Sequence, residues 1–270
     1  MSGIELRKSR FFNRRDKLII SALDHVMEYG DQPGIENSET AIRNCLSTDA
    51  LLLSRYMLKR FGHLMRGNDA PIPVVRINWS SSFYYPLSYN GGFTQIATTV
   101  EDAVQAGGEA VICSLFLENN NEQMETENVA LFSEVVRQKE KLGIPLIGEC
   151  YVVEHESLTA NELHSKVKRV TRVMAELGAD MIKCFFTGDT FREIVDNLPV
   201  PVFTIGADKL DTDLAVLQKA EESIRRGADG IIFGRNIFMA KNPKSLVEAL
   251  NAVMNDGIDS KTAADKYQLT

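Results

Sequence analysis

The chain of 270 residues has few cysteines, no excess of basic charge and no long apolar run, and each shortage excludes a class of protein. Its four cysteines are widely spaced and form no CxxC pair, so neither a disulfide framework nor a zinc knuckle is expected. The formal net charge is −7, whereas a general nucleic-acid binder needs a basic surface. Apolar runs stay below the roughly 18 residues of a membrane span, and the basic stretch Met1–Asp16 lacks the apolar segment of a signal peptide. We therefore predict a cytoplasmic protein with no nucleic-acid or membrane partner.

Motifs for metals and nucleotides are also missing. The histidines His25, His63, His155 and His164 form no HxH or HxxxH pair, so a zinc site would require distant positions to converge. No Walker-type glycine loop occurs, and no GxGxxG follows the first expected strand. The sequence therefore predicts neither a metal nor a cofactor.

Short aliphatic runs do recur along the whole chain, and amphipathic helical patterns lie between them. Several runs are almost continuously apolar, as expected for parallel strands buried on both faces. Eight expected strands that alternate with helices in a chain of this length favour one closed (β/α)8 TIM barrel over an open doubly wound sheet. The expected strands are Leu18–Leu23, Ala50–Leu53, Val74–Asn78, Ala110–Leu115, Leu146–Tyr151, Asp180–Cys184, Val200–Ile205 and Gly230–Gly234. The expected helices are Thr99–Ala106, Glu127–Leu142, Ala160–Leu177, Asp213–Arg226 and Ser245–Met254.

No low-complexity linker divides the chain, so residues 1–270 are expected to form a single barrel domain with short polar extensions at both ends. The stretch Trp79–Asn90, rich in Ser and Tyr, predicts a long loop after the third strand. The polar tail Asn255–Thr270 is expected either to be mobile or to pack on a partner.

Lys183 is the most informative charged residue, because it lies inside the apolar run of the sixth expected strand. Lysine is almost never fully buried without a reason. Burial disfavours the ammonium form of a lysine, and a neutral lysine is a nucleophile that forms imines with carbonyl compounds. An ion pair with a barrel carboxylate is the alternative, and position alone leaves both interpretations open.

Function in such barrels gathers at the carboxyl ends of the strands, where further reactive side chains are found. Asp24 follows the first strand, where it could move protons, pair with Lys183 or only cap a helix. Tyr151 follows the fifth strand and could act as an acid or base, or be an ordinary rim aromatic. Glu149 lies two residues earlier and should face the same side. His25 could orient a substrate or be a satisfied rim histidine.

The last two strands lead into loops that predict an anion site. Gly206 and Ala207 follow the seventh strand, and Gly234 and Arg235 follow the eighth. Loops at these places often bind phosphate in (β/α)8 barrels, and an arginine adds a charged fork. A glycine at a strand end is a weak signal by itself. Together with the nearby Lys209, however, these residues indicate a phosphate-binding region.

These motifs together resemble the archaeal-type class I fructose-bisphosphate aldolase family, which also contains aminodideoxyheptulosonate synthases and autoinducer-2-phosphate thiolases. The resemblance covers roughly residues 10 to 255. It implies that Lys183 forms the imine, that Tyr151 acts as acid and base, and that Asp24 assists proton transfer. It also implies a homo-oligomer, because relatives assemble into rings. The matching segments are Leu23-Asp24-His25, Pro73–Arg76, Val100–Ala103, Glu149-Cys150-Tyr151, Ala179–Lys183, Thr187-Gly188-Asp189 and Gly234–Phe238, and the implied phosphate ligands are Gly206, Ala207, Gly234 and Arg235.

The sequence departs from the family pattern at three places. Val26 and Ala207 replace family glycines, and Met239 replaces a glutamine. A Cβ atom at position 207 would crowd the approach of an anion to the backbone. We therefore expect the substrate, rather than the lysine chemistry, to differ within the family.

The resemblance implies reversible cleavage of a phosphorylated ketose, of the fructose-bisphosphate type, into dihydroxyacetone phosphate and an aldehyde. A transaldol transferase, or a thiolase acting on a phosphorylated diketone with the same lysine, is the alternative. Tyr151 favours the aldol reaction, because the thiolase-like relatives lack the tyrosine. A third hypothesis is a non-catalytic binder of sugar phosphates on the same barrel.

Overall fold

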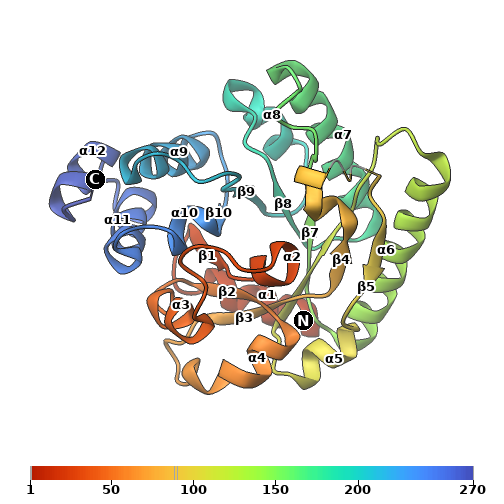
Figure 1. Cartoon of the computed structure of the whole chain (residues 1–270), viewed down its shortest axis with the longest axis horizontal. Coiled ribbons are helices and arrows are strands. Elements are labelled where there is room, and N and C mark those ends of the chain that lie inside the picture. Colours follow the sequence, from red (N-terminus) through yellow and green to blue (C-terminus); the bar gives the residue numbers. More distant parts are fainter. Residues whose placement is uncertain (1, 88, 90, 270) are drawn as a thin grey trace.

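The computed structural model describes residues 2–87, 89 and 91–269, and its centre is a closed barrel of parallel strands (Figure 1). Every neighbouring pair of barrel strands is parallel, and the last strand returns to pair with the first. The prediction of a (β/α)8 barrel is confirmed. The barrel strands, in spatial order, are β1 (Leu18–Ala22), β2 (Ala50–Ser54), β3 (Ile72–Arg76), β6 (Ala110–Ser114), β7 (Leu146–Glu149), β8 (Met181–Cys184), β9 (Val202–Ile205) and β10 (Gly230–Phe233).

The apolar runs form barrel strands because both of their faces are covered. In β1 all five residues are buried: Leu18 and Ile20 belong to the cluster inside the barrel, while Ile19 belongs to the cluster between the strands and the helices. Side chains alternate along a strand, so a continuous apolar run supplies both clusters at once.

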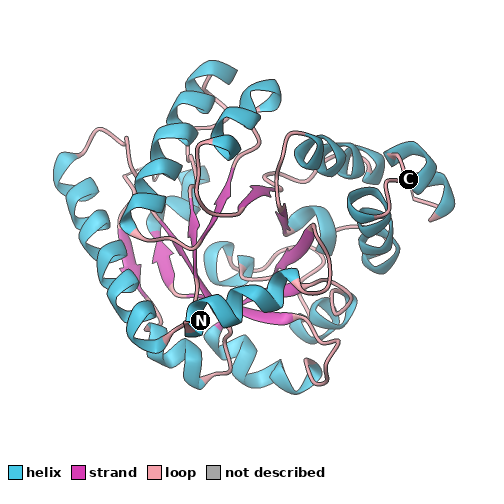
Figure 2. Cartoon of the chain, turned by 180° about the vertical axis from the view of Figure 1, so that it is seen from behind, coloured by secondary structure: helices cyan, strands magenta, loops and turns pink. Residues whose placement is uncertain are grey.

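Helices cover the outside of the barrel in both views (Figures 1 and 2). The two longest, α6 (Glu122–Leu142) and α7 (Ala160–Leu177), agree with predicted helices, although α6 begins five residues earlier than expected. Asn121 explains the earlier start, because its side chain accepts a hydrogen bond from the backbone N–H of Met124 at 3.0 Å and caps the helix. The other predicted helices are α5 (Val100–Gln105), α9 (Asp213–Arg225) and α11 (Pro243–Asn255).

Short helices follow several strands and were not predicted, because a single turn or two carries little periodic signal. They are α2 (His25–Tyr29), α3 (Ser38–Asn44), α4 (Arg55–Phe61), α8 (Phe191–Asp196) and α10 (Arg235–Phe238). Two of them, α2 and α10, begin within three residues of the ends of β1 and β10 and therefore position residues of the barrel mouth.

The amino-terminal extension forms α1 (Gly3–Phe12), which lies across one end of the barrel (Figure 2). Phe11 is fully buried in the cluster inside the barrel, and the Phe12 ring lies 6.4 Å from that of Phe203. The extension therefore closes the end of the barrel opposite the carboxyl ends of the strands.

The carboxyl-terminal tail contains a helix that packs on its own chain, which the sequence did not predict. Residues Ser260–Lys266 form helix α12, which packs on α9 and α11 of the same chain. Ala263 and Ala264 are buried at this contact. Small side chains allow even a polar helix to pack closely, and the polar composition of the tail gave no indication of this.

The expected loop Trp79–Asn90 is only partly irregular. Trp79 and Ser80 belong to β4 (Asn78–Ser80), which pairs antiparallel with β5 (Thr94–Ile96), and a 3₁₀ segment, Ser81–Leu87, follows β4. Ser88 and Asn90 lie outside the described residues. The segment brings Phe83 to the barrel mouth. No helix in the described part of the chain combines the length and apolarity needed to cross a membrane.

Candidate active site

Lys183 lies at the carboxyl end of β8 with its amine inside the barrel mouth, and the residue is only 5% exposed. The register of β7 and β8 sets Glu149 directly beside it, and the Lys183 Nζ atom lies 2.5 Å from Glu149 Oε1. Lys183 therefore has the carboxylate partner that the alternative interpretation, a structural ion pair, required. Because this pair lies at the end of the barrel where function gathers, a reactive role is equally compatible with it.

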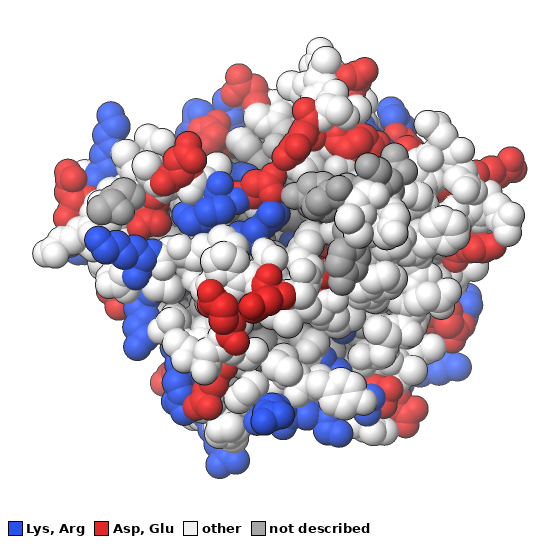
Figure 3. All heavy atoms as spheres, in the orientation of Figure 1, with Lys and Arg blue, Asp and Glu red and all other residues white. Residues whose placement is uncertain are grey.

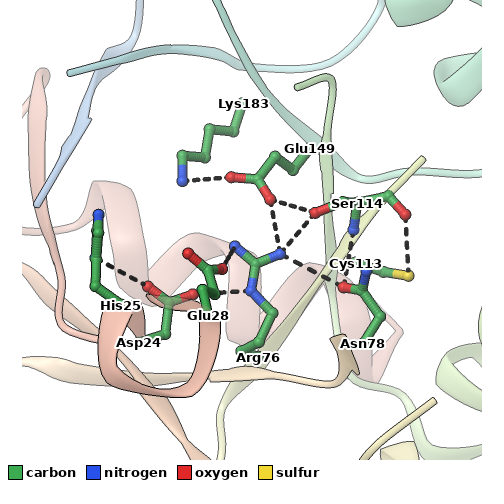
Figure 4. A network of polar contacts seen from close by, with 9 residues as sticks. All are labelled: Asp24, His25, Glu28, Arg76, Asn78, Cys113, Ser114, Glu149 and Lys183. Atoms are coloured by element: carbon green, nitrogen blue, oxygen red, sulfur yellow. Dashed lines mark hydrogen bonds and ion pairs between the residues drawn. The ribbon is translucent and has the colours of Figure 1, made fainter. Parts of the chain in front are cut away.

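Arg76, at the end of β3, is the centre of the network around this pair (Figure 4). The arginine is 1% exposed. Its Nε atom lies 2.8 Å from Asp24 Oδ2, its Nη1 atom 2.7 Å from Glu149 Oε2, and its Nη2 atom 3.1 Å from Glu28 Oε1. One guanidinium group thus faces three carboxyl groups from two parts of the chain, the α2 segment and the end of β7.

Sequence reasoning assigned no role to Arg76 or Glu28. For Arg76 a signal was present, because an arginine that ends the apolar run Pro73-Val74-Val75 is as unusual as a lysine inside one. For Glu28 there was none, because it lies in a short segment of mixed polar and apolar residues after the first strand.

Ser114 and Asn78 hold the arginine and Glu149 together (Figure 4). Arg76 Nη1 donates to Ser114 Oγ at 2.8 Å, and Ser114 Oγ in turn donates to Glu149. The Asn78 side-chain oxygen accepts from the Ser114 backbone N–H at 3.0 Å. These neutral groups fix the orientation of the charged ones without adding charge.

Glu149 is a carboxylate in this setting. Burial raises its pKa, but the charges of Arg76 and Lys183, and hydrogen bonds to both, outweigh burial and hold the pKa below its ordinary value. A permanently ionised Glu149 is suited to orient the Lys183 amine and poorly suited to store a proton.

Asp24, which was predicted to transfer protons, lies just behind the pocket. It is 2% exposed and precedes α2, and it is not among the described residues that line the pocket. Its Oδ1 atom lies 3.7 Å from His25 Nδ1. The structure therefore places Asp24 where it sets the charge around Arg76 and His25.

His25 lines the pocket at the first turn of α2. Burial is the main cause that lowers its pKa, to about 4; the Asp24 charge opposes this, and the cations Lys183, Arg235 and Arg76 reinforce it. At neutral pH the ring is uncharged. A Cβ atom on Gly234 would overlap the His25 ring, so the glycine at the end of β10 is required by this packing.

Tyr151 follows β7 and lines the same pocket as Lys183. Its ring lies 5.4 Å from that of Phe185 and 6.0 Å from that of His155. Tyr29, on α2, is hydrogen-bonded to Tyr151, and burial, the neighbouring Tyr151 and Glu28, and this bond raise the pKa of Tyr29. The predicted acid–base tyrosine is therefore part of a pair of phenols, of which sequence reasoning had found one.

Gly206, Ala207, Gly234 and Arg235 come together in the same pocket, as their places after β9 and β10 predicted. Ala207 has φ +56°, a left-handed conformation that favours glycine and costs an alanine about 1 kcal/mol. This conformation gives a physical reason for the glycine that the family has at this place.

Arg235 is held by a carboxylate of the preceding loop. Its Nη1 atom lies 2.7 Å from Asp208 Oδ1, and the Asp208 side chain is 42% exposed. An incoming anion would therefore meet a guanidinium group that is already paired with an exposed, displaceable carboxylate.

The lysine that supports this region is Lys219 of α9, which sequence reasoning missed. Its Nζ atom donates to the Gly206 carbonyl oxygen at 2.8 Å, and burial lowers its pKa to about 8 despite the Asp208 charge. The predicted Lys209 instead donates to the Leu210 carbonyl at 3.0 Å and is not among the described residues that line the pocket.

The pocket at the barrel mouth is narrow and opens to solvent. In Figure 3, basic and acidic side chains lie together near the middle of the face that Figure 1 shows, so this face has no extended field of one sign. The described lining consists of Ala22, His25, Glu28, Tyr29, Phe83, Glu149, Tyr151, Lys183, Ile205, Gly206, Ala207, Ile232, Gly234 and Arg235.

Two groups among the described residues have the spacing of metal ligands: Asp24, His25 and Glu28, and His155, Glu156 and Asp208. Ligand atoms of Asp24, His25 and Glu28 lie within 4.8 Å of one another. The Arg76 guanidinium, however, already contacts both carboxyl groups and supplies positive charge there. The absence of a metal stays a prediction.

A closed barrel with a polar pocket at the carboxyl ends of its strands has the architecture of a (β/α)8 enzyme. The chain belongs to the DeoC/LacD family of aldolases, whose model matches residues 18–240. It is 28% identical over 264 residues to an uncharacterized aldolase of Saccharolobus solfataricus, with 96% of this chain and 97% of that one covered. It is 27% identical over 269 residues to the 3-hydroxy-5-phosphonooxypentane-2,4-dione thiolase of Escherichia coli K12, with 99% and 86% covered. Among solved structures, an archaeal fructose 1,6-bisphosphate aldolase superposes with a TM-score of 0.77 at 24% identity, over 93% of this chain and 98% of the other.

Proposed function

We propose that the protein is a class I aldolase that cleaves a phosphorylated ketose, of the fructose-bisphosphate type, through an imine on Lys183. The observation that carries this proposal is the buried Lys183 amine, held by Glu149 in a pocket that also contains Tyr151 and the β9 and β10 loops. A buried amine and an anion-binding region in one pocket suit a substrate that has both a ketone and a phosphate.

In the proposed reaction the neutral Lys183 amine attacks the ketone, and loss of water gives an iminium ion. The iminium withdraws electrons, so the adjacent carbon–carbon bond breaks to give an aldehyde and an enamine. Tyr151 takes the proton from the hydroxyl group that becomes the aldehyde and returns it to the enamine carbon. Asp24 assists by keeping Arg76 and His25 in place.

The phosphate is proposed to bind at Gly206, Ala207, Gly234 and Arg235. Backbone N–H groups of the two loops and the Arg235 fork offer several donors to a dianion. Lys219 lies behind Gly206 and adds positive charge. Lys209, which bonds to its neighbour's carbonyl, has no part in this proposal.

Cleavage of a phosphorylated diketone by a thiol, or transaldol transfer, is the second candidate. The near full-length similarity to a thiolase favours keeping it. It uses the same imine but passes the fragment to an acceptor. Assays for free dihydroxyacetone phosphate, with and without a thiol or an acceptor aldehyde, separate the two reactions.

Reductive trapping tests the imine directly. The protein is incubated with dihydroxyacetone phosphate and borohydride, and the labelled residue is identified by peptide mapping. We expect one adduct on Lys183 and at least about a thousandfold loss of turnover in Lys183→Met. Mapping of the adduct to another residue, or an active Lys183→Met protein, would contradict the proposal.

Two further parts of the proposal concern the intact cell and the assembled protein. We infer a cytoplasmic homo-oligomer that binds neither membranes nor nucleic acid. Cell fractionation and light scattering of the purified protein test the first two properties, and sedimentation with vesicles or with DNA tests the others.

A further inference from the structure

The mouth of the barrel contains one more acidic group than basic groups in its buried network. Asp24, Glu28 and Glu149 face Arg76, and Glu149 also faces Lys183. All five side chains are at least nine-tenths buried. Three carboxylates and two cations would leave a net negative charge out of water, which is costly, so one carboxyl group is expected to keep its proton.

Of the three carboxyl groups, Glu28 has the weakest contacts that could stabilise a negative charge. Asp24 accepts a hydrogen bond from Arg76 at 2.8 Å, and Glu149 lies within 2.7 Å of both Arg76 and Lys183. Glu28 is 5% exposed, and its contact with Arg76, at 3.1 Å, lacks hydrogen-bond geometry, so Oε1 remains without a donor. The proton therefore belongs on Glu28.

Glu28 also has a position that the other two do not share. It lines the pocket together with Lys183, whereas Asp24 is not among the described lining residues, and Glu149 is committed to two cations. Figure 4 shows the Glu28 carboxyl group beside the guanidinium, with one oxygen pointing away from Arg76. A protonated carboxyl group in this place can donate a hydrogen bond into the pocket.

We propose that Glu28 is the general acid that protonates the hydroxyl group lost as water when the Lys183 adduct becomes an iminium ion. This role rests on the proposed function, because it acts on the adduct of Lys183. Burial, and then the nearby Asp24, raise the pKa of Glu28 well above its ordinary value, while Arg76 opposes them, which agrees with a carboxyl group that is protonated at neutral pH.

The step balances within the network. The proton of Glu28 moves to the hydroxyl oxygen of the carbinolamine, the carbon–oxygen bond breaks, water leaves, and the nitrogen lone pair forms the C=N bond. The new positive charge on nitrogen compensates the new Glu28 carboxylate. The Lys183 ammonium first loses one proton to solvent, and the neutral amine that results passes a second proton to the ketone oxygen as the carbinolamine forms. After the water has left, Glu28 takes a proton back from solvent, so the departing water carries two protons and the count balances.

The test is the rate of borohydride trapping with dihydroxyacetone phosphate as a function of pH, in the full-length wild type and in Glu28→Gln. A general acid contributes about 100-fold or more, so we expect Glu28→Gln to be trapped about 100 times more slowly. The wild-type rate should fall as pH rises through the pKa of Glu28. That dependence should be absent from Glu28→Gln and kept by Glu28→Asp, a pattern that a merely structural role does not produce.

The exposed Glu36, which follows α2, provides a matched control: Glu36→Gln should be trapped at the wild-type rate. Equal trapping rates and pH profiles for Glu28→Gln and wild type would overturn the role of Glu28 while leaving the imine intact. Absence of any Lys183 adduct in the wild type would instead overturn the proposed function itself. If Glu28→Gln fails to fold, the wild-type profile still decides, because a rate that does not fall with rising pH overturns the proposal.

Discussion

The interior of the barrel has two layers, which lie on the same strands and have opposite chemistry. In the lower layer, inward-facing side chains are apolar and form one cluster with Phe11 of α1. Two residues further along four of these strands, the side chain is polar or charged. The changes are Val74 to Arg76 on β3, Ile112 to Ser114 on β6, Ile147 to Glu149 on β7 and Met181 to Lys183 on β8.

The difference shows how one barrel supports both stability and chemistry. A step of two residues returns to the same face of a strand, so each strand can place an apolar residue in the core and a functional one directly above it. The lower layer is stabilised by burial of independent apolar groups. The upper layer is stabilised by mutual pairing, so each charged group depends on the others. Changes in the two layers should therefore differ in size and in their dependence on pH.

Arg76→Met should have the largest effect on stability. It leaves three buried carboxyl groups without their shared cation, and loss of one partner of a buried ion pair costs about 3–5 kcal/mol. Ile147→Val, in the lower layer on β7, should lower the free energy of unfolding by only about 1 kcal/mol. Urea unfolding at neutral pH measures both, and equal losses would show that the two layers do not differ in this way.

The polar residues around the upper layer should also make stability depend on pH, through His25 of α2. The pKa of His25 in the folded protein, about 4, lies below its ordinary value of 6.5. Between these two values the histidine is protonated in the unfolded chain but not in the folded protein. Stability should therefore fall as pH falls from 6.5 towards 4, with about 2 kcal/mol lost to this residue at pH 5.

Urea unfolding of wild type and His25→Gln at pH 7 and pH 5 tests this effect. The loss between the two pH values should be smaller in His25→Gln by that amount. The exposed His63 is the control, and His63→Gln should behave as wild type. A loss of the same size in all three proteins would assign the acid sensitivity to other groups.

A smaller effect is expected at the loops after β9 and β10, where the ion pair is partly exposed. Asp208→Asn removes the carboxylate that occupies Arg235, and exposed pairs contribute less than about 1 kcal/mol, so KM for a phosphorylated ketose should fall about threefold. KM for the unphosphorylated ketone should not change. An equal change for both ketones would place the effect of Asp208 outside phosphate binding.

Ala207→Gly should have the smallest effect on stability. Relief of the left-handed strain favours glycine by about 1 kcal/mol, while the greater freedom of glycine in the unfolded chain costs about as much. Thermal unfolding should therefore change little. Phosphate binding should improve if the methyl group crowds the loop, and weaker binding of phosphorylated ketose to Ala207→Gly would contradict a phosphate site here.

The elements were predicted well where their pattern is long, and poorly where it is short. All eight barrel strands lie within two residues of their expected bounds, because continuous apolar runs rich in β-branched residues are typical of parallel strands buried on both faces. The short helices α2 and α10 escaped prediction, although they carry His25, Glu28 and Arg235. Lys209 was chosen for its nearness in sequence to Gly206, whereas in the structure Lys209 donates to the Leu210 carbonyl and Lys219 of α9 donates to the Gly206 carbonyl.

The sequence by itself determined the barrel and the unusual positions of its charged residues, because a lysine or arginine at the end of an apolar strand is visible without a structure. It did not determine their partners. Glu149 meets Lys183 because β7 and β8 pair in one particular register, and Arg76 meets Asp24 and Glu28 because closure of the barrel brings the residues that follow β1 close to the end of β3. Register and closure depend on the packing of the whole barrel, so only the tertiary structure decided which carboxyl group lacks a cation of its own.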